Sequence, residues 1–135
     1  KGSLTEMVQE YVSMDERIVN VGYLDYDQYL DRLRNAQILV NPRNMNLQEN
    51  ENNFPSKTME YLATGKCIIS TRFAGYERFK KYMFFCGSSA EDIKAAIETV
   101  IEDGIYKDQD IYLRNREFAK TFLWESQVQK LLSKI

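Results

Sequence analysis

NNFPSKTMEYLATGKCIIST, residues 52–71, is the stretch that decides the fold. Pro55 suits the first turn of a helix, where amide hydrogens lack intrahelical partners, and Gly65 suits the left-handed residue that ends one. The apolar run KCIIST that follows predicts a buried strand. A helix that leads directly into a buried strand is one unit of an α/β fold.

The same alternation of helix and strand continues on both sides of this stretch. Alternating elements of this kind predict a parallel sheet with helices on both faces, here in a single domain over residues 1–135. Asp25 is expected to cap the second helix. The expected helices cover 4–12, 25–36, 55–64, 74–82, 88–104, 108–121 and 124–134, and the expected strands cover 17–23, 37–42, 66–71 and 83–87.

The composition excludes several function classes. Eighteen basic residues nearly balance 20 acidic ones, so no overall positive field favours nucleic acid. There is no histidine, which excludes histidine-based nucleophilic catalysis and makes a zinc site improbable. Cys67 and Cys86 lie in apolar runs and are expected to be reduced and buried. Reduced thiols favour a cytoplasmic setting. No run reaches the roughly 20 apolar residues of a transmembrane helix, so we expect a soluble chain.

Ligands of parallel sheets bind beyond the carboxyl ends of the strands. In this chain the rule points to the loops at 22–25, 42–54 and 71–75, all of which are polar or contain glycine. Residues 44–53 form a long segment rich in Asn, Gln and Glu, and compact domains keep such loops mainly for function.

The helix that starts near Pro55 is the best candidate for an anion site. The amides of Ser56 and Lys57 should face outward at its tip, where the helix dipole favours a diphosphate. Glu60 lies four residues after Ser56 on the same face, which is about the distance from a diphosphate to its ribose. Arg43, after the strand that Pro42 ends, could reach a phosphate.

Structural interpretations of these residues stay open. Asn53 could be an ordinary helix cap, with Lys57 and Glu60 a solvated charge pair, and Arg43 could simply be hydrated. The charge run at 77–81 predicts a solvated face, although its basic side chains could approach a phosphate or a lipid head group.

Residues 17–43, 52–71 and 73–79 together resemble the nucleotide-sugar-binding C-terminal domain of GT-B glycosyltransferases of the group 1, family 4-like set. The resemblance runs from about residue 3 to the end, and residues 54–66 look like the subset of enzymes that build bacterial surface polysaccharides. It implies a Rossmann-like, three-layer domain that forms the C-terminal half of the GT-B fold.

The resemblance also implies roles for single residues. The family pairs two glutamates as E-x7-E, the first at the sugar and the second at the ribose. Glu60 matches the second, whereas Asn52 stands at the first. The candidates are Ser56, Lys57 and Arg43 for the diphosphate, Glu60 for the ribose, Asn52, Asn53 and Phe54 for the sugar, and Gly22, Tyr23 and Leu24 for the base.

The family closes two domains over a UDP-, GDP- or ADP-sugar and transfers the sugar to a glycan or lipid-linked acceptor, without a cofactor or bound metal. We therefore expect the first strand, the acceptor domain and the catalytic residues to precede this chain, which alone should bind nucleotide weakly and transfer nothing. A peripheral position at the inner membrane face is left open for the full-length protein. The alternative is a non-catalytic nucleotide-binding or regulatory module. A dinucleotide dehydrogenase is disfavoured because no G-x-G-x-x-G follows a strand.

Overall fold

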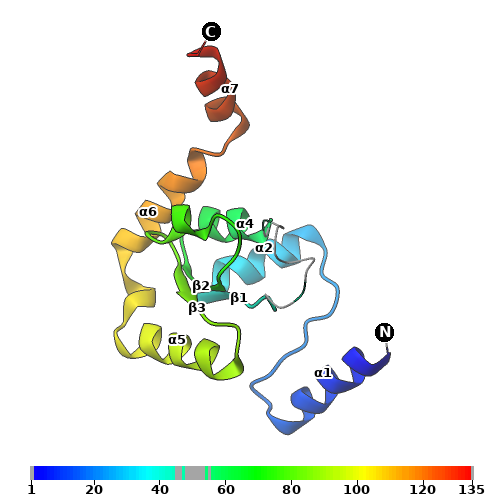
Figure 1. Ribbon diagram of the computed structural model, residues 1–135. Helices are drawn as coiled ribbons and strands as arrows, with labels where there is room; N and C mark the ends of the chain where they lie inside the picture. Colours follow the sequence, from blue (N-terminus) through cyan, green and yellow to red (C-terminus); the bar gives the residue numbers. More distant parts are fainter. Residues whose placement is uncertain (1, 45–46, 48–53, 55, 135) are drawn as a thin grey trace. The chain divides into compact units, whose positions relative to one another are not determined.

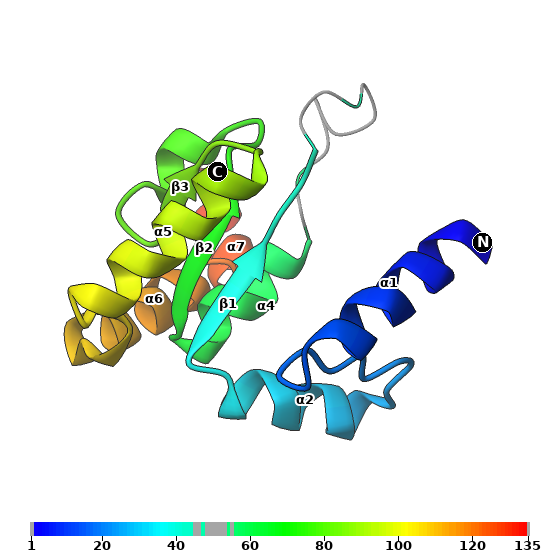
Figure 2. The same ribbon diagram turned by 90° about the horizontal axis from the view of Figure 1, so that it is seen from below.

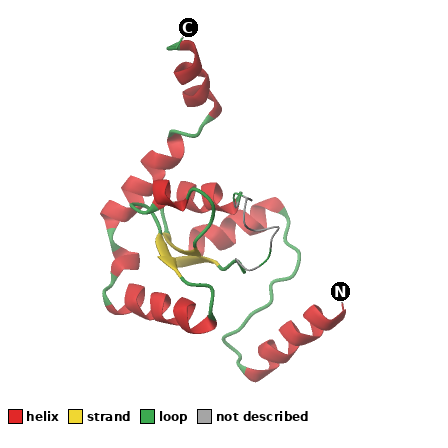
Figure 3. Ribbon diagram, in the orientation of Figure 1, coloured by secondary structure: helices red, strands yellow, loops and turns green. Residues whose placement is uncertain are grey.

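The computed structural model describes residues 2–44, 47, 54 and 56–134 (Figure 1). Helices and short strands alternate along much of the chain (Figure 3). The chain divides into two compact units, Lys1–Arg32 and Leu33–Ile135, with the boundary inside one helix. The elements are α1 (Gly2–Met14), α2 (Tyr26–Asn35), β1 (Ile38–Asn41), α4 (Lys57–Thr64), β2 (Cys67–Thr71), the 3-10 helix η1 (Tyr76–Phe79), β3 (Phe84–Cys86), α5 (Ala90–Glu102), the 3-10 helix η2 (Ile105–Lys107), α6 (Gln109–Lys120) and α7 (Trp124–Leu132).

The second unit contains a three-stranded parallel sheet in the order β1-β2-β3 (Figure 2). Leu39 pairs with Ile68 between β1 and β2, and Ser70 pairs with Phe85 between β2 and β3. All five residues of the central strand β2 are buried, as its unbroken apolar run predicts. The parallel sheet expected from the sequence is confirmed.

One face of this sheet is covered by α4 and by the segments around η1 and α6. Its buried core contains Leu62 of α4, Ile68 of β2 and the side chains of Phe73, Phe79 and Met83. Phe118 of α6 packs against this cluster, and α4 and α6 lie in extensive contact.

The other face is covered by α5. Val100 of this helix is 1% exposed and packs with Cys67 and Ile69, which point to the opposite side of β2 from Ile68. Helices therefore lie on both faces of the sheet (Figure 1), so this part of the chain is a mixed α/β structure with three layers.

The ends of the helices follow the predicted capping residues. Gly65 ends α4 in a left-handed conformation with φ 76°, and its N–H donates to the carbonyl of Leu62. The Ser89 hydroxyl accepts from the amide of Asp92 at the start of α5. Asp25 caps α2 by accepting from the amide of Gln28 at 2.9 Å. The helices expected over 108–121 and 124–134 are confirmed as α6 and α7.

The strand expected over residues 17–23 is wrong. The backbone there is irregular, and Ile18, Val19 and Val21 expose 43%, 69% and 41% of their surface. β-branched residues favour a strand where a neighbouring strand and a core receive them, and no ladder partner pairs with this segment in the described part of the chain. Tyr26, the first residue of α2, is likewise 73% exposed.

The short helix expected over residues 74–82 is reduced to the single 3-10 turn η1. Gly75, in a left-handed conformation with φ 77°, stands immediately before it, which prevents the helix from starting earlier.

No helix in the described residues is long and apolar enough to cross a membrane.

Candidate functional site

The carboxyl ends of the three strands lie at one edge of the sheet, where hydroxyl groups tie the chain together. The Ser70 hydroxyl lies 2.9 Å from the carbonyl of Thr71 and 3.3 Å from that of Asn41, both of which accept from it. The Thr71 hydroxyl accepts from the amide of Arg43 at 2.9 Å. These bonds continue the link between β1 and β2 past the end of the ladder, and they fix the start of the loop that follows β1.

Among the described residues, Ser56 stands at the N-cap position of α4 and forms no side-chain cap. Ser56, at the N-cap position, has helical angles (φ −53°, ψ −37°), and its hydroxyl accepts no hydrogen bond from the helix. A capping hydroxyl normally satisfies one of the first-turn amides and would compete with a ligand for it. The Ser56 side chain therefore does not compete for the first-turn amides, and anion binding at this tip stays a prediction.

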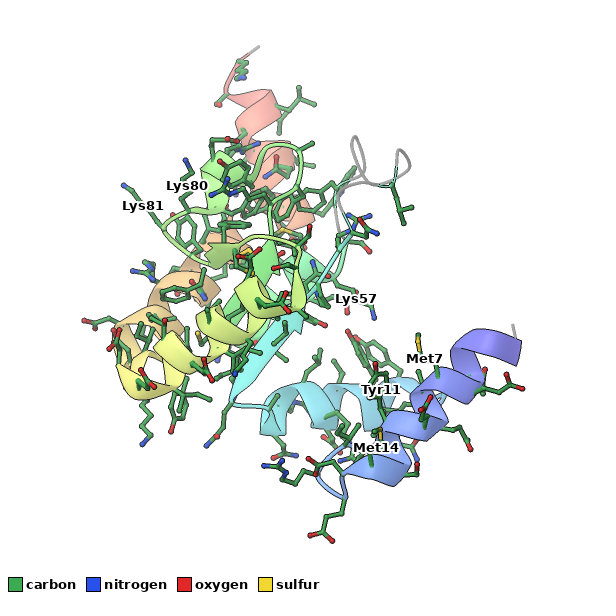
Figure 4. The ribbon with its side chains drawn as sticks, turned by 60° about the horizontal axis from the view of Figure 1, so that its bottom comes forward. Met7, Tyr11, Met14, Lys57, Lys80 and Lys81 are labelled. Atoms are coloured by element: carbon green, nitrogen blue, oxygen red, sulfur yellow. The ribbon has the colours of Figure 1, made fainter. Side chains whose placement is uncertain are left out.

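Lys57 and Glu60 are both exposed on α4, and Figure 4 shows Lys57 extending from the start of this helix. The fully buried Thr58 and Leu62 face the core from the opposite side. The pKa of the neighbouring Tyr61 phenol is raised first by burial and then by the negative charge of Glu60. Glu60 therefore lies beside Tyr61, about one turn along α4 from the helix tip.

Two buried polar atoms near this helix lack hydrogen-bond partners within the described structure. Thr58 is 0% exposed and the Oγ1 atom of its side chain is unpartnered, as is the buried Nδ2 of Asn41. Thr58 is the second residue of α4 and Asn41 the last of β1, and these two elements are in contact. Buried polar groups are nearly always hydrogen-bonded, so each of these two atoms is an exception within the described structure.

A hollow of about 370 Å³ opens at the same edge of the sheet. Arg43 lines it together with Pro42, Asn44, Ser88 and Ser89. Ser88 and Ser89, which follow β3, are functional candidates that sequence reasoning missed. The signal was present, since a Gly-Ser-Ser run directly follows a strand that ends at the ligand-binding edge. The described lining residues do not include Ser56, Lys57 or Glu60.

Phe54 was predicted as a sugar contact, and the structure places its ring against the core. Its centroid lies 5.6 Å from that of Phe73 and 5.7 Å from that of Phe79, although 42% of the residue remains exposed. Its role at a sugar stays a prediction. The other sugar candidates, Asn52 and Asn53, lie outside the described residues.

The base candidates belong to the first unit. Gly22 has φ 62° and donates its N–H to the side-chain oxygen of Asn20. Tyr23 is fully exposed, whereas Leu24 is half-buried. The Tyr23 ring is therefore accessible for stacking, and its role at a base stays a prediction.

The described residues contain no cluster of three or more side chains that could hold a metal ion. Cys67 is buried and Cys86 half-buried, and neither forms a disulfide. Burial raises the pKa of the Cys67 thiol to about 11 and also raises that of Cys86, so both thiols are protonated and unreactive near neutral pH.

No protein-family model matches the chain, and searches among curated proteins and solved structures find nothing similar to it. By its structure alone, the chain is a mixed α/β protein with a three-stranded parallel sheet and polar groups at the carboxyl edge of that sheet.

Proposed function

We propose that this chain is the donor-binding part of a GT-B glycosyltransferase, with a Rossmann-like fold that holds a nucleotide diphosphate sugar at the tip of α4. The observation that supports the proposal is the first turn of α4, where Ser56 forms no side-chain cap and which begins beside the carboxyl edge of a parallel sheet. Parallel α/β sheets bind nucleotides at that edge, and a helix tip there favours the phosphates.

The donor lies along α4 in this proposal. Its diphosphate accepts hydrogen bonds from the amides at Ser56 and Lys57, and its ribose hydroxyls donate to Glu60. The Lys57 ammonium and the Arg43 guanidinium add positive charge beside the phosphates. Asn41, the last residue of β1, adds a buried amide at the carboxyl edge of the sheet.

The same arrangement would assist sugar transfer. When the bond between the sugar and the diphosphate breaks, negative charge grows on the departing diphosphate. Amides at a helix tip stabilise that charge more strongly than the charge of the intact donor, so they lower the barrier without moving a proton. The acceptor is a glycan or a lipid-linked sugar.

Calorimetric titration with UDP, GDP and ADP tests the site. Glu60→Gln should weaken the preferred nucleotide about tenfold, because a hydrogen bond to a charged group is lost. Glu102→Gln on α5, which makes the same charge change at an exposed helix position, is the matched control and should bind as the wild type does. Equal affinities of the wild type and Glu60→Gln would remove Glu60 from the site.

A second assay distinguishes the transferase from the alternative, a nucleotide-binding module without transferase activity. The longest protein that contains this chain is incubated with UDP-, GDP- and ADP-sugars, and release of the nucleotide is measured. Release from one donor that depends on Ser56 and Glu60 supports a transferase. Tight nucleotide binding without release from any donor favours the binding module.

A further inference from the structure

A larger hollow, of about 680 Å³, lies beside β3, one of the two edge strands of the sheet. Four basic side chains line it, Arg72, Lys80, Lys81 and Arg114, together with Tyr76 and the first residues of β3. We refer to it as the basic pocket. It shares no residue with the proposed donor site on α4.

The charge of the basic pocket stands out against the rest of the chain. The whole sequence has a net charge of −2, yet four cations and no carboxylate line this hollow. None of the four cations forms an ion pair within the described residues, whereas Arg17, Lys94 and Lys120, which lie outside the pocket, do. The positive charge of the four lining cations is thus not neutralised by a carboxylate within ion-pair distance in the described structure.

An aromatic ring organises two of these cations. The Nζ atom of Lys80 lies 5.0 Å from the centre of the Tyr76 ring, and the guanidinium carbon of Arg72 lies 5.8 Å from it. The Tyr76 ring in turn packs edge-on against Phe85 of β3, with centroids 5.1 Å apart. Cation–π attraction therefore holds two like charges near each other on a ring that is anchored to the sheet.

The four cations come from three separate segments. Arg72 directly follows β2, Lys80 and Lys81 precede β3, and Arg114 belongs to α6. Figure 4 shows Lys80 and Lys81 extending side by side, far from Lys57 on α4. A lysine run on a solvated turn would not require basic side chains from other segments beside it. Because cations from three segments line one hollow, the arrangement indicates a binding site more than a hydrated surface.

We propose that the basic pocket binds a phosphorylated ligand that carries at least two phosphate groups. A single phosphate would leave most of the four cations facing one another without a counter-charge, whereas two or three phosphates can engage all of them. Arginine grips phosphate oxygens in pairs and lysine supplies point charges. The hollow has the volume typical of small-ligand pockets. The phosphates could belong to a soluble compound or to a lipid head group.

Calorimetry with inorganic tripolyphosphate tests the pocket. The double variant Lys80→Gln, Lys81→Gln should lose at least about tenfold in affinity, since two charge-assisted contacts disappear. The matched control is Lys94→Gln, Lys107→Gln, which removes the same charge from exposed lysines elsewhere and should stay within about twofold of the wild type. Equal losses in both double variants would mean that net charge alone governs binding, and would overturn the proposal.

Vesicles of phosphatidylcholine with and without cardiolipin, whose head group carries two phosphates, distinguish the sources. If the wild type binds tripolyphosphate and the Lys80→Gln, Lys81→Gln variant binds it more weakly, the ligand is a soluble compound. Binding to cardiolipin vesicles alone, lost in the same variant, assigns the site to a lipid head group. The double variant Arg72→Gln, Arg114→Gln is measured in the same two assays. If it and the lysine variant both bind tripolyphosphate and cardiolipin vesicles as the wild type does, the basic pocket is not a phosphate site.

UDP titrations keep this proposal separate from the donor site. The Lys80→Gln, Lys81→Gln variant should keep the wild-type affinity for UDP, and Glu60→Gln should keep the wild-type affinity for tripolyphosphate. If UDP binding instead falls only in the lysine variant, the nucleotide occupies the basic pocket. That result would overturn the donor site on α4 and support the pocket.

Discussion

Replacing Gly65 with alanine tests how closely α4 and α6 must approach. Gly65 ends α4 with φ 76°, a conformation that side chains disfavour. A Cβ atom at this position would lie 2.5 Å from Cδ2 of Tyr112 and 2.8 Å from its backbone carbonyl oxygen. The tyrosine ring can rotate away, but the carbonyl belongs to α6 and moves only with that helix.

Gly75→Ala is the matched control for this substitution. Gly75 has nearly the same backbone angle, φ 77°, and nothing lies within 4 Å of its would-be Cβ. A left-handed alanine costs about 1–2 kcal/mol, and the stiffer unfolded chain offsets about 0.4–1 kcal/mol of that, so Gly75→Ala should lose about 1 kcal/mol. Gly65→Ala adds overpacking of about 1–3 kcal/mol, for a total of about 2–4 kcal/mol.

Urea unfolding followed by far-ultraviolet circular dichroism measures both free energies of unfolding. The reasoning predicts a larger loss for Gly65→Ala, with similar denaturant slopes for the two variants. If the two variants lose the same free energy, the close approach of α6 to Gly65 has no energetic weight and the contact-based argument fails.

Three further substitutions test the core, a cap and a thiol. Leu62→Ala, at a fully buried position, should cost about 2–5 kcal/mol in urea unfolding, and a loss below about 1 kcal/mol would contradict the packing described for that face. Ser89→Ala should cost about 0.5–2 kcal/mol because its hydroxyl accepts from the amide of Asp92, whereas Ser88→Ala should be nearly neutral. The pKa of Cys67 is raised from 9.0 to about 11, so above pH 9 the unfolded chain releases a proton that the folded chain keeps, and stability should fall as the pH rises from about 9 to about 11. Cys67→Ala should show a shallower fall over that range in pH-dependent urea midpoints, and identical slopes would count against the buried thiol.

Much of the sheet unit could be predicted from local patterns. Gly65 and Ser89 mark helix ends because their roles depend only on the backbone within a few residues of each. The unbroken apolar run of β2 predicts a strand covered on both faces, which the structure confirms. These features depend on neighbours along the chain, so the sequence is enough to predict them.

Features that depend on distant segments could not be predicted. The β-branched residues at 17–23 have the composition of a strand, but a strand also needs a partner, and composition does not supply one. The charge run at 77–81 predicts a solvated face, because nothing local indicates that Arg114, about 35 residues later, lines the same hollow. The unpartnered Thr58 hydroxyl is likewise visible only once its surroundings are known.

The central position of β2 has a consequence for how this unit opens. Ile68 belongs to the core on one face, Cys67 and Ile69 belong to the core on the other, and both neighbouring strands pair with β2. Local fluctuations that lift either helical layer leave the strand covered from the other side. Its ladder amides should therefore exchange with deuterated solvent only when the whole unit unfolds, as the slowest-exchanging group in the chain. The helical layers on the two faces are then expected to unfold in one transition, because both pack on the same five-residue strand.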